Sequence, residues 1–188
     1  MSKEKLLLVG AGGFGRMMSE HAILKYECAF VDDGQPVGAK VCGIPVIGHI
    51  TDLPDLRKEY DLLVVGIGNN QFRAQVYKNA KILGYSFPNI IASSAYISPY
   101  AKLGYGCVVL QNASVQNGAV VGNGVLLNAG AEVHADASVG DYSLIYTNST
   151  MRTGAHIGNY VRIGSNVTVC NNAFVLDNAD ISDCIAVH

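Results

Sequence analysis

The sequence lacks the features that mark membrane and nucleic-acid-binding proteins. No apolar run in its 188 residues reaches the roughly 18 needed to cross a bilayer. The formal net charge of −2 gives no electrostatic reason to expect a nucleic acid as partner. Residues 1–5 are mostly polar and lead directly into a predicted strand, so we expect no secretory signal. These absences predict a protein without membrane or nucleic-acid partners.

The cysteines follow neither a metal-binding nor a disulfide pattern. They are irregularly spaced and include no CxxC pair: Cys28, Cys42, Cys107, Cys170 and Cys184. No other cluster of ligand residues stands out, so no metal is expected. With 49% hydrophobic and 15% charged residues, the composition is that of a globular protein. The chain is therefore predicted to be a reduced, cytoplasmic protein.

From Ile91 to the end of the chain, an aliphatic side chain recurs at every sixth position. A small or β-branched residue stands four places after nearly every one of them. A period of six fits neither an amphipathic helix nor a simple alternating strand, but it is typical of a parallel β-helix. The aliphatic positions are Ile91, Ile97, Leu103, Val109, Val115, Val121, Leu127, Val133, Val139, Ile145, Met151, Ile157, Ile163, Val169, Val175, Ile181 and Val187.

Each group of six residues is predicted to form one short strand and a corner, and three groups to form one triangular turn. The aliphatic side chain points into the prism, and the small residue lies where the corner leaves little room. Glycine and asparagine between them suit corners with positive φ. Successive turns should stack at roughly 4.8 Å. The alternative, a β-sandwich, would show turn signals at irregular intervals and no fixed period.

The first 88 residues are predicted to form a small Rossmann-like α/β domain. A buried strand at 5–9 precedes the motif G-x-G-x-x-G at 10–15, a helix over 16–25, and a strand at 29–31 that ends in Asp32-Asp33. In a nucleotide site of this kind, glycine N–H groups and the helix N-terminus approach phosphate, and the acid holds ribose. Alternatively, the glycines only permit close packing of helix and strand.

The rest of this domain is predicted to contain a short edge segment at 43–48, a short helix at 51–60, a third buried strand at 61–67 and a helix over 71–83. Three or four strands make half of a full dinucleotide fold, which argues against a hydride-transferring dehydrogenase. A mononucleotide or a nucleotide-linked sugar is the better-sized ligand. We therefore predict two domains, 1–88 for the nucleotide sugar and 89–188 for the β-helix.

With both halves in view, the chain resembles the NeuD/PglD family of bacterial sugar acetyltransferases. The resemblance rests on segments 10–15, 31–33, 66–70 and 90–98, and on the repeat at 127–142. It implies a Rossmann-like domain followed by a left-handed β-helix. It also implies a homotrimer that moves acetyl from acetyl-CoA to an amine or hydroxyl of a sugar, often UDP- or GDP-linked, in glycan or surface-polysaccharide synthesis.

The resemblance also implies where the ligands bind. CoA would lie along the β-helix in a groove between subunits, with Gly164 and Ser165 as contacts. The reaction needs a general base, typically a histidine oriented by a carboxylate, and backbone N–H groups for the oxyanion. The nucleotide-linked sugar is expected at Gly10, Gly12, Gly13, Phe14, Asp32, Asp33, Gly68 and Asn69.

The chain departs from the family at the base. The family's histidine position holds Ala135, followed by the expected acid, Asp136, while a histidine lies one residue earlier, at His134. A shift of one residue in a strand turns a side chain to the other face, although a coil corner is less strict. His134 is therefore either a displaced base, oriented by Asp136 or Glu132, or a surface histidine. A second family histidine falls on Leu144.

Two alternatives to the enzyme follow from this departure. The chain could be a non-catalytic, nucleotide-sugar-binding or scaffolding trimer, since the family's last coil and tail are also absent and an open end needs a cap. It could also be an acyltransferase for another acceptor, such as an amino acid.

Overall fold

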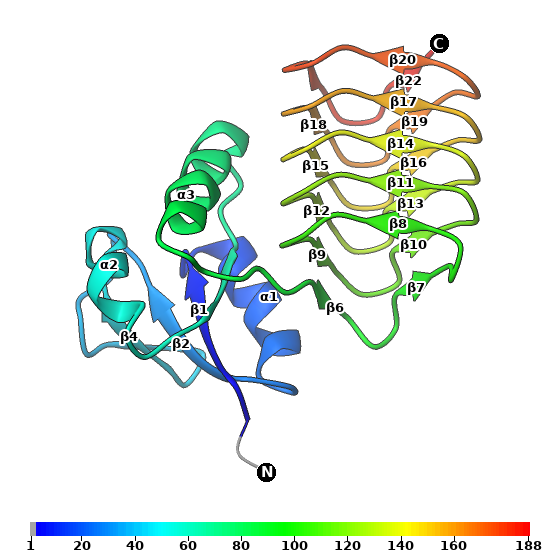
Figure 1. Cartoon of the computed structure of the whole chain (residues 1–188). Helices are drawn as coiled ribbons and strands as arrows, with labels where there is room; N and C mark the ends of the chain where they lie inside the picture. Colours follow the sequence, from blue (N-terminus) through cyan, green and yellow to red (C-terminus); the bar gives the residue numbers. More distant parts are fainter. Residues whose placement is uncertain (1–2) are drawn as a thin grey trace. The chain divides into compact units, whose positions relative to one another are not determined.

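The computed structural model describes residues 3–188 (Figure 1). The chain divides into two compact units, Met1–Ile90 and Ile91–His188. The first is an α/β domain and the second a left-handed parallel β-helix, which confirms the predicted fold class. No helix within residues 3–188 has the length and apolar character that crossing a membrane requires.

The N-terminal unit is built on one mainly parallel sheet. Its strands span Lys5–Val9 (β1), Glu27–Val31 (β2), Lys40–Val41 (β3), Ile44–Gly48 (β4) and Leu62–Val65 (β5). The order across the sheet is β3-β4-β2-β1-β5, and β3 is antiparallel to β4. In β1, the four residues after Lys5 are completely buried. The predicted buried strands are therefore confirmed.

The expectation that the segment with Pro45 forms the sheet edge is wrong. The two-residue strand β3 lies outside β4. Proline is tolerated there because its neighbour Val46 makes the hydrogen bonds on that side, donating to Ala39 O and accepting from Gly38 N, both at 2.8 Å.

The helices follow the strands at their carboxyl ends. They span Gly13–Ala22 (α1), Ile50–Asp52 (the 3₁₀ turn η1), Leu53–Leu56 (α2) and Asn70–Ile82 (α3). The side chain of Asn69 caps α3 by accepting a hydrogen bond from the Phe72 N–H at 2.9 Å. The chain leaves α3 through Gly84, whose φ is +85°.

Glycines let α1 approach the sheet closely. A Cβ at Gly15 would overlap the carbonyl oxygen of Gly10, and one at Gly66 would lie 2.7 Å from the Cα of Gly15. At Gly12 and Gly13, by contrast, an added Cβ would meet no atom within 4 Å. The packing explanation therefore holds for Gly15, while Gly12 and Gly13 border open space.

The β-helix has three parallel sheets, one on each side of a triangular prism (Figure 1). One sheet contains β7 (Tyr96–Ile97), β10 (Ser114–Val115), β13 (Glu132–Val133), β16 (Thr150–Met151), β19 (Thr168–Val169) and β22 (Ala186–Val187). The second contains β8 (Lys102–Leu103), β11 (Val120–Val121), β14 (Ser138–Val139), β17 (His156–Ile157) and β20 (Phe174–Val175). The third contains β6 (Ile90–Ile91), β9 (Val108–Val109), β12 (Leu126–Leu127), β15 (Leu144–Ile145), β18 (Arg162–Ile163) and β21 (Asp180–Ile181).

The predicted aliphatic register forms the core of the prism. The second residue of each strand points inward, and the small residue at the following corner packs against it. Two of the small positions are serines, Ser143 and Ser149, which are completely buried. Each hydroxyl donates to a carbonyl of the next coil and accepts an N–H from it, so neither polar group is left unsatisfied.

Side chains at one corner form a ladder along the axis. Asn123, Asp141, Asn159 and Asp177 stand 18 residues apart, and each except Asn123 accepts a hydrogen bond from the backbone N–H of the residue before it in the ladder. The Asn159 N–H donates to the carboxylate of Asp177 at 2.8 Å, and this bond lowers the pKa of Asp177. The ladder therefore joins successive coils at this corner.

Replacing Gly15 by alanine should destabilise the N-terminal unit by about 1–3 kcal/mol or more, because the backbone of Gly10 must move to admit the methyl group. Gly13→Ala is the matched control, since its methyl group enters open space in the same helix. Urea denaturation of both variants measures the difference. Equal stability of the two variants would contradict the packing described.

The ladder should make stability depend on acid pH. Because folding lowers the pKa of Asp177, its contribution is present at neutral pH and is lost as the pH falls below its ordinary value of 3.8 and through the folded pKa. Asp177→Asn, which cannot ionise, should remove this part of the pH dependence. Urea denaturation between pH 7 and pH 3 should therefore show a steeper loss for the natural sequence, and parallel curves would refute this role.

Candidate functional site

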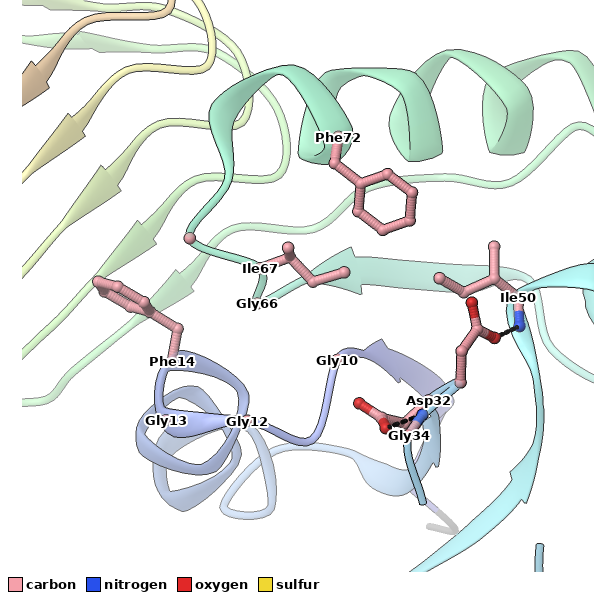
Figure 2. A pocket seen from close by; sticks show the side chains of 12 residues that line it. Gly10, Gly12, Gly13, Phe14, Asp32, Gly34, Ile50, Gly66, Ile67 and Phe72 are labelled. Atoms are coloured by element: carbon pink, nitrogen blue, oxygen red, sulfur yellow. Dashed lines mark hydrogen bonds between the residues drawn. The ribbon is translucent and has the colours of Figure 1, made fainter. Parts of the chain in front are cut away.

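A cavity of about 380 Å³ opens at the carboxyl ends of the parallel strands in the N-terminal unit (Figure 2). Loops that follow β1, β2, β4 and β5 supply its wall, together with the first turns of α1 and α3. This is the usual ligand position in an open α/β sheet. It is lined by Gly10, Gly12, Gly13, Phe14, Asp32, Asp33, Gly34, Ile50, Gly66, Ile67, Gly68 and Phe72.

Asp32 ties the glycine loop to the end of β2. Its Oδ2 accepts the Ala11 N–H at 2.6 Å and its Oδ1 accepts the Gly34 N–H at 2.8 Å. Gly10 N also donates to Val31 O at 2.9 Å. A carboxylate oxygen accepts more than one hydrogen bond, so Asp32 can order the loop and still bind a ligand hydroxyl.

Asp33 holds the loop after β4 against the cavity. Its Oδ1 accepts the Ile50 N–H at 2.8 Å. The Nδ1 of His49 lies 3.1 Å from the carbonyl oxygen of Asp32 and 4.0 Å from the Asp33 carboxylate. The acidic pair thus positions two walls of the cavity in addition to lining it.

The other side of the cavity is apolar. Figure 2 shows the ring of Phe72 and the side chains of Ile50 and Ile67 gathered above the glycine loop. Phe72 is 45% exposed, so its ring is available to a ligand. A flat group can pack between these side chains while hydroxyls reach Asp32 and hydrogen-bond acceptors reach the glycine N–H groups.

Of the residues predicted to bind the nucleotide sugar, all but Asn69 line this one cavity. Gly68 lies in its wall, while the Asn69 side chain caps α3. Sequence reasoning missed Ile50, Ile67 and Phe72. A single apolar residue in a loop or on an exposed helix turn belongs to no recognisable sequence motif. The one available signal was that these residues follow predicted strands, at the edge of the sheet where ligands bind.

His134 is hydrogen-bonded to Glu132, with 3.0 Å between Nε2 and Oε2. The two side chains share the outer face of the β13 sheet because Val133 between them points into the core. The His134 side chain is 27% exposed. Asp136 lies in the following corner with φ +57°, and its carboxylate packs over Gly118 of the preceding coil. Among residues 3–188, Glu132 is thus the carboxylate that contacts His134.

The predicted CoA contacts lie in the stacked backbone of the β-helix. Gly164 donates its N–H to Ile181 O at 2.8 Å, and Ser165 donates its N–H to the Asp183 carboxylate at the same distance. Gly164 is buried, and Ser165 is partly exposed.

A second histidine pair lies on the β14–β17 face. Ser138 Oγ and His156 Nδ1 are 2.8 Å apart. The His156 ring stacks on the ring of Phe174, with 4.7 Å between the two ring centroids. Sequence reasoning did not identify this pair, although its 18-residue spacing is the period of one coil. Within residues 3–188, no group of three or more His, Cys, Asp or Glu side chains is arranged to hold a metal ion.

Comparisons with known proteins match both units. Residues 5–80 match the PglD N-terminal domain, and residues 136–171 match the six-repeat bacterial transferase hexapeptide family. The acetyltransferase domain of PglB from Neisseria gonorrhoeae FA1090 is 31% identical and has a TM-score of 0.94. That match covers 99% of this chain and 92% of that one.

Two solved complexes are also similar to the chain. The same gonococcal domain in complex with acetyl coenzyme A is 33% identical over 98% of this chain and 96% of that one, with a TM-score of 0.88. A mutant perosamine N-acetyltransferase from Caulobacter crescentus, in complex with CoA and GDP-perosamine, is 25% identical. It covers 97% of this chain and 92% of that one, with a TM-score of 0.61.

Replacing Asp32 by alanine should lower the free energy of unfolding by about 1–3 kcal/mol, because two backbone N–H groups lose a charged acceptor. Asp33→Ala removes one such bond and should cost less. Chemical denaturation measures both variants. If Asp33→Ala were the more damaging change, Asp32 would not be the residue that orders the glycine loop.

Proposed function

The chain belongs to the NeuD/PglD family of sugar acetyltransferases, and we propose that it transfers acetyl from acetyl-CoA to an amine or hydroxyl of a nucleotide-linked sugar. The observation that carries this proposal is the 31% identity to an acetyltransferase domain over 99% of the chain. The likeness to a domain in complex with acetyl coenzyme A supports acetyl-CoA as the donor.

The nucleotide-linked sugar binds in the cavity of the N-terminal unit. Its chemistry fits, because Gly12 and Gly13 border open space at the start of α1, where a helix N-terminus favours phosphate. Asp32 is available to ribose hydroxyls, and Phe72 offers a ring for the base to stack on. The GDP-perosamine complex of the Caulobacter enzyme is consistent with a sugar nucleotide as ligand.

His134 is the general base, and Glu132 orients it. If Nε2 donates its proton to Glu132, Nδ1 keeps a lone pair and can take a proton from the acceptor. The acceptor nitrogen or oxygen then attacks the thioester carbonyl, the C–S bond breaks, and the CoA thiolate leaves and is protonated.

CoA passes along the β-helix at Gly164 and Ser165. Asp136 is the other carboxylate that the sequence analysis considered for orienting His134. Its role is structural, because its side chain packs over Gly118 in the corner of the coil.

The protein acts as a cytoplasmic homotrimer. Three large apolar side chains on or next to the outer face of the β8–β20 sheet support self-association: Val120, Phe174 and Leu176 are 45%, 69% and 79% exposed. All five cysteines are free thiols, which suits a reducing compartment.

One observation favours a second candidate, a non-catalytic nucleotide-sugar-binding trimer. The two positions at which the family carries histidines hold Ala135 and Leu144, and neither side chain can move a proton. In that case His134 and Glu132 would form an ordinary surface ion pair.

Replacing His134 by alanine should lower the rate of acetyl transfer by roughly 10²–10⁴ with little effect on acetyl-CoA binding. Glu132→Gln should lower the rate less, because the histidine remains. His21→Ala is the matched control, a histidine in the last turn of α1 that does not line the cavity. A steady-state assay with UDP- and GDP-linked amino sugars measures all three, and an unchanged rate for His134→Ala rules out this base.

Calorimetric titration with acetyl-CoA tests the donor without any choice of acceptor. We expect saturable binding of one molecule per chain. A folded, trimeric protein that gives no heat at millimolar acetyl-CoA would instead support the non-catalytic candidate.

A further inference from the structure

Arg73 in α3 is a completely buried arginine behind the wall of the cavity. None of its side chain is exposed, and it does not line the cavity, whereas Ile67 and Gly68 do. Burying a guanidinium group costs several kcal/mol unless hydrogen bonds compensate. The partners of Arg73 therefore indicate what this buried charge does.

Those partners include two backbone carbonyl groups of the loop between β5 and α3 and the side chain of Asn70, the first residue of α3. Nη1 donates to the carbonyl oxygens of Ile67 at 2.7 Å and Gly68 at 3.3 Å. Nη2 donates to Oδ1 of Asn70 at 2.8 Å. One turn further along the same helix face, the hydroxyl of Tyr77 accepts the Val65 N–H at 3.0 Å.

These contacts take the place of a neighbouring strand at the carboxyl end of β5. β5 is the last strand in the order of the sheet, and beyond it, within residues 3–188, only Ser86 pairs with its start, accepting the Leu63 N–H at 3.0 Å and donating to Asp61 O at 2.9 Å, so the carboxyl end of β5 has no strand partner on that side. Side chains of α3 take that place at the end of β5 and in the loop that follows. The direction of the Ile67–Asn69 peptide groups is therefore set by Arg73.

That direction leaves two N–H groups available. In a trans peptide the C=O and N–H point in opposite directions, so the N–H groups of Gly68 and Asn69 point away from Arg73. Neither has a hydrogen-bond acceptor within residues 3–188. The glycine loop after β1 lies next to this loop, because a Cβ added at Gly10 would lie 2.6 Å from Cγ1 of Ile67.

We propose that Arg73 is a positioning residue for the phosphates of the sugar nucleotide, an inference that rests on the proposed function. Arg73 turns the Gly68 and Asn69 N–H groups toward the cavity, where they face the start of α1 across the ligand. Its positive charge lies behind the wall formed by Ile67 and Gly68, and the charged side chains that line the cavity are those of Asp32 and Asp33. The diphosphate is then held between two sets of N–H groups.

The test compares Arg73→Met and Arg73→Lys with Lys78→Met, a control that removes an exposed cation from the same helix. Calorimetry with UDP, GDP and acetyl-CoA is run on each full-length variant. We expect Arg73→Met to raise the dissociation constant of the nucleoside diphosphate about tenfold or more, with acetyl-CoA binding unchanged. Arg73→Lys should recover part of the loss, since an ammonium group cannot match the planar guanidinium at all three acceptors.

Amide hydrogen exchange at Val65 and Gly66, whose N–H groups donate to the Tyr77 hydroxyl and to Val9 O next to this loop, separates this inference from the proposed function. Faster exchange there in Arg73→Met, with protection of β1 retained, supports the positioning role even if the natural protein binds neither UDP nor GDP, an outcome that would defeat the nucleotide proposal alone. Unchanged exchange and unchanged nucleotide affinity would overturn the inference. If the methionine variant does not fold, Arg73→Lys and its exchange pattern decide the matter in the same way.

Discussion

The stacking of coils by backbone hydrogen bonds is the constraint on which the C-terminal unit depends. The N–H groups of the strands donate to carbonyl groups of the neighbouring coil, as in the bond from Thr150 N to Val167 O at 2.8 Å. Because each coil must repeat the one beneath it, a side chain's face follows from its place among the six positions. Val133 is in the core, so Glu132 and His134 must both face outward, and Asp136 must lie in the corner. The position of His134 in the repeat therefore gives it Glu132, and not Asp136, as its carboxylate partner.

In the N-terminal unit, polar side chains order the loops that form the cavity. Asp32 and Asp33 were expected to bind ligand, and the structure gives each of them backbone N–H groups to hold as well. Arg73 does the same for carbonyl groups on the opposite wall. Such loops have no strand partners, so side-chain hydrogen bonds set their shape and a pre-formed cavity results.

Buried polar groups follow the same rule in both units. Ser143 and Ser149 occupy positions where the register predicts a small core residue, and each joins two coils through a donor and an acceptor. Arg73 joins α3 to the loop after β5. A buried polar side chain fixes geometry when all of its partners are present, and it destabilises the fold when one is lost.

The sequence by itself determined the β-helix, its register and its inward-facing residues. The preference for an aliphatic residue at one position of six is weak in any single group, but it recurs in every group from Ile91 onward. It also determined the strand, glycine motif, helix and acid that lead to the cavity, since these are contiguous in the chain. Only the tertiary structure decided that Glu132 contacts His134, that β3 lies outside β4, and that Phe72 and Ile50 share a cavity. These pairings depend on corners and loops whose paths are set by non-local hydrogen bonds, and no local pattern in the sequence encodes them.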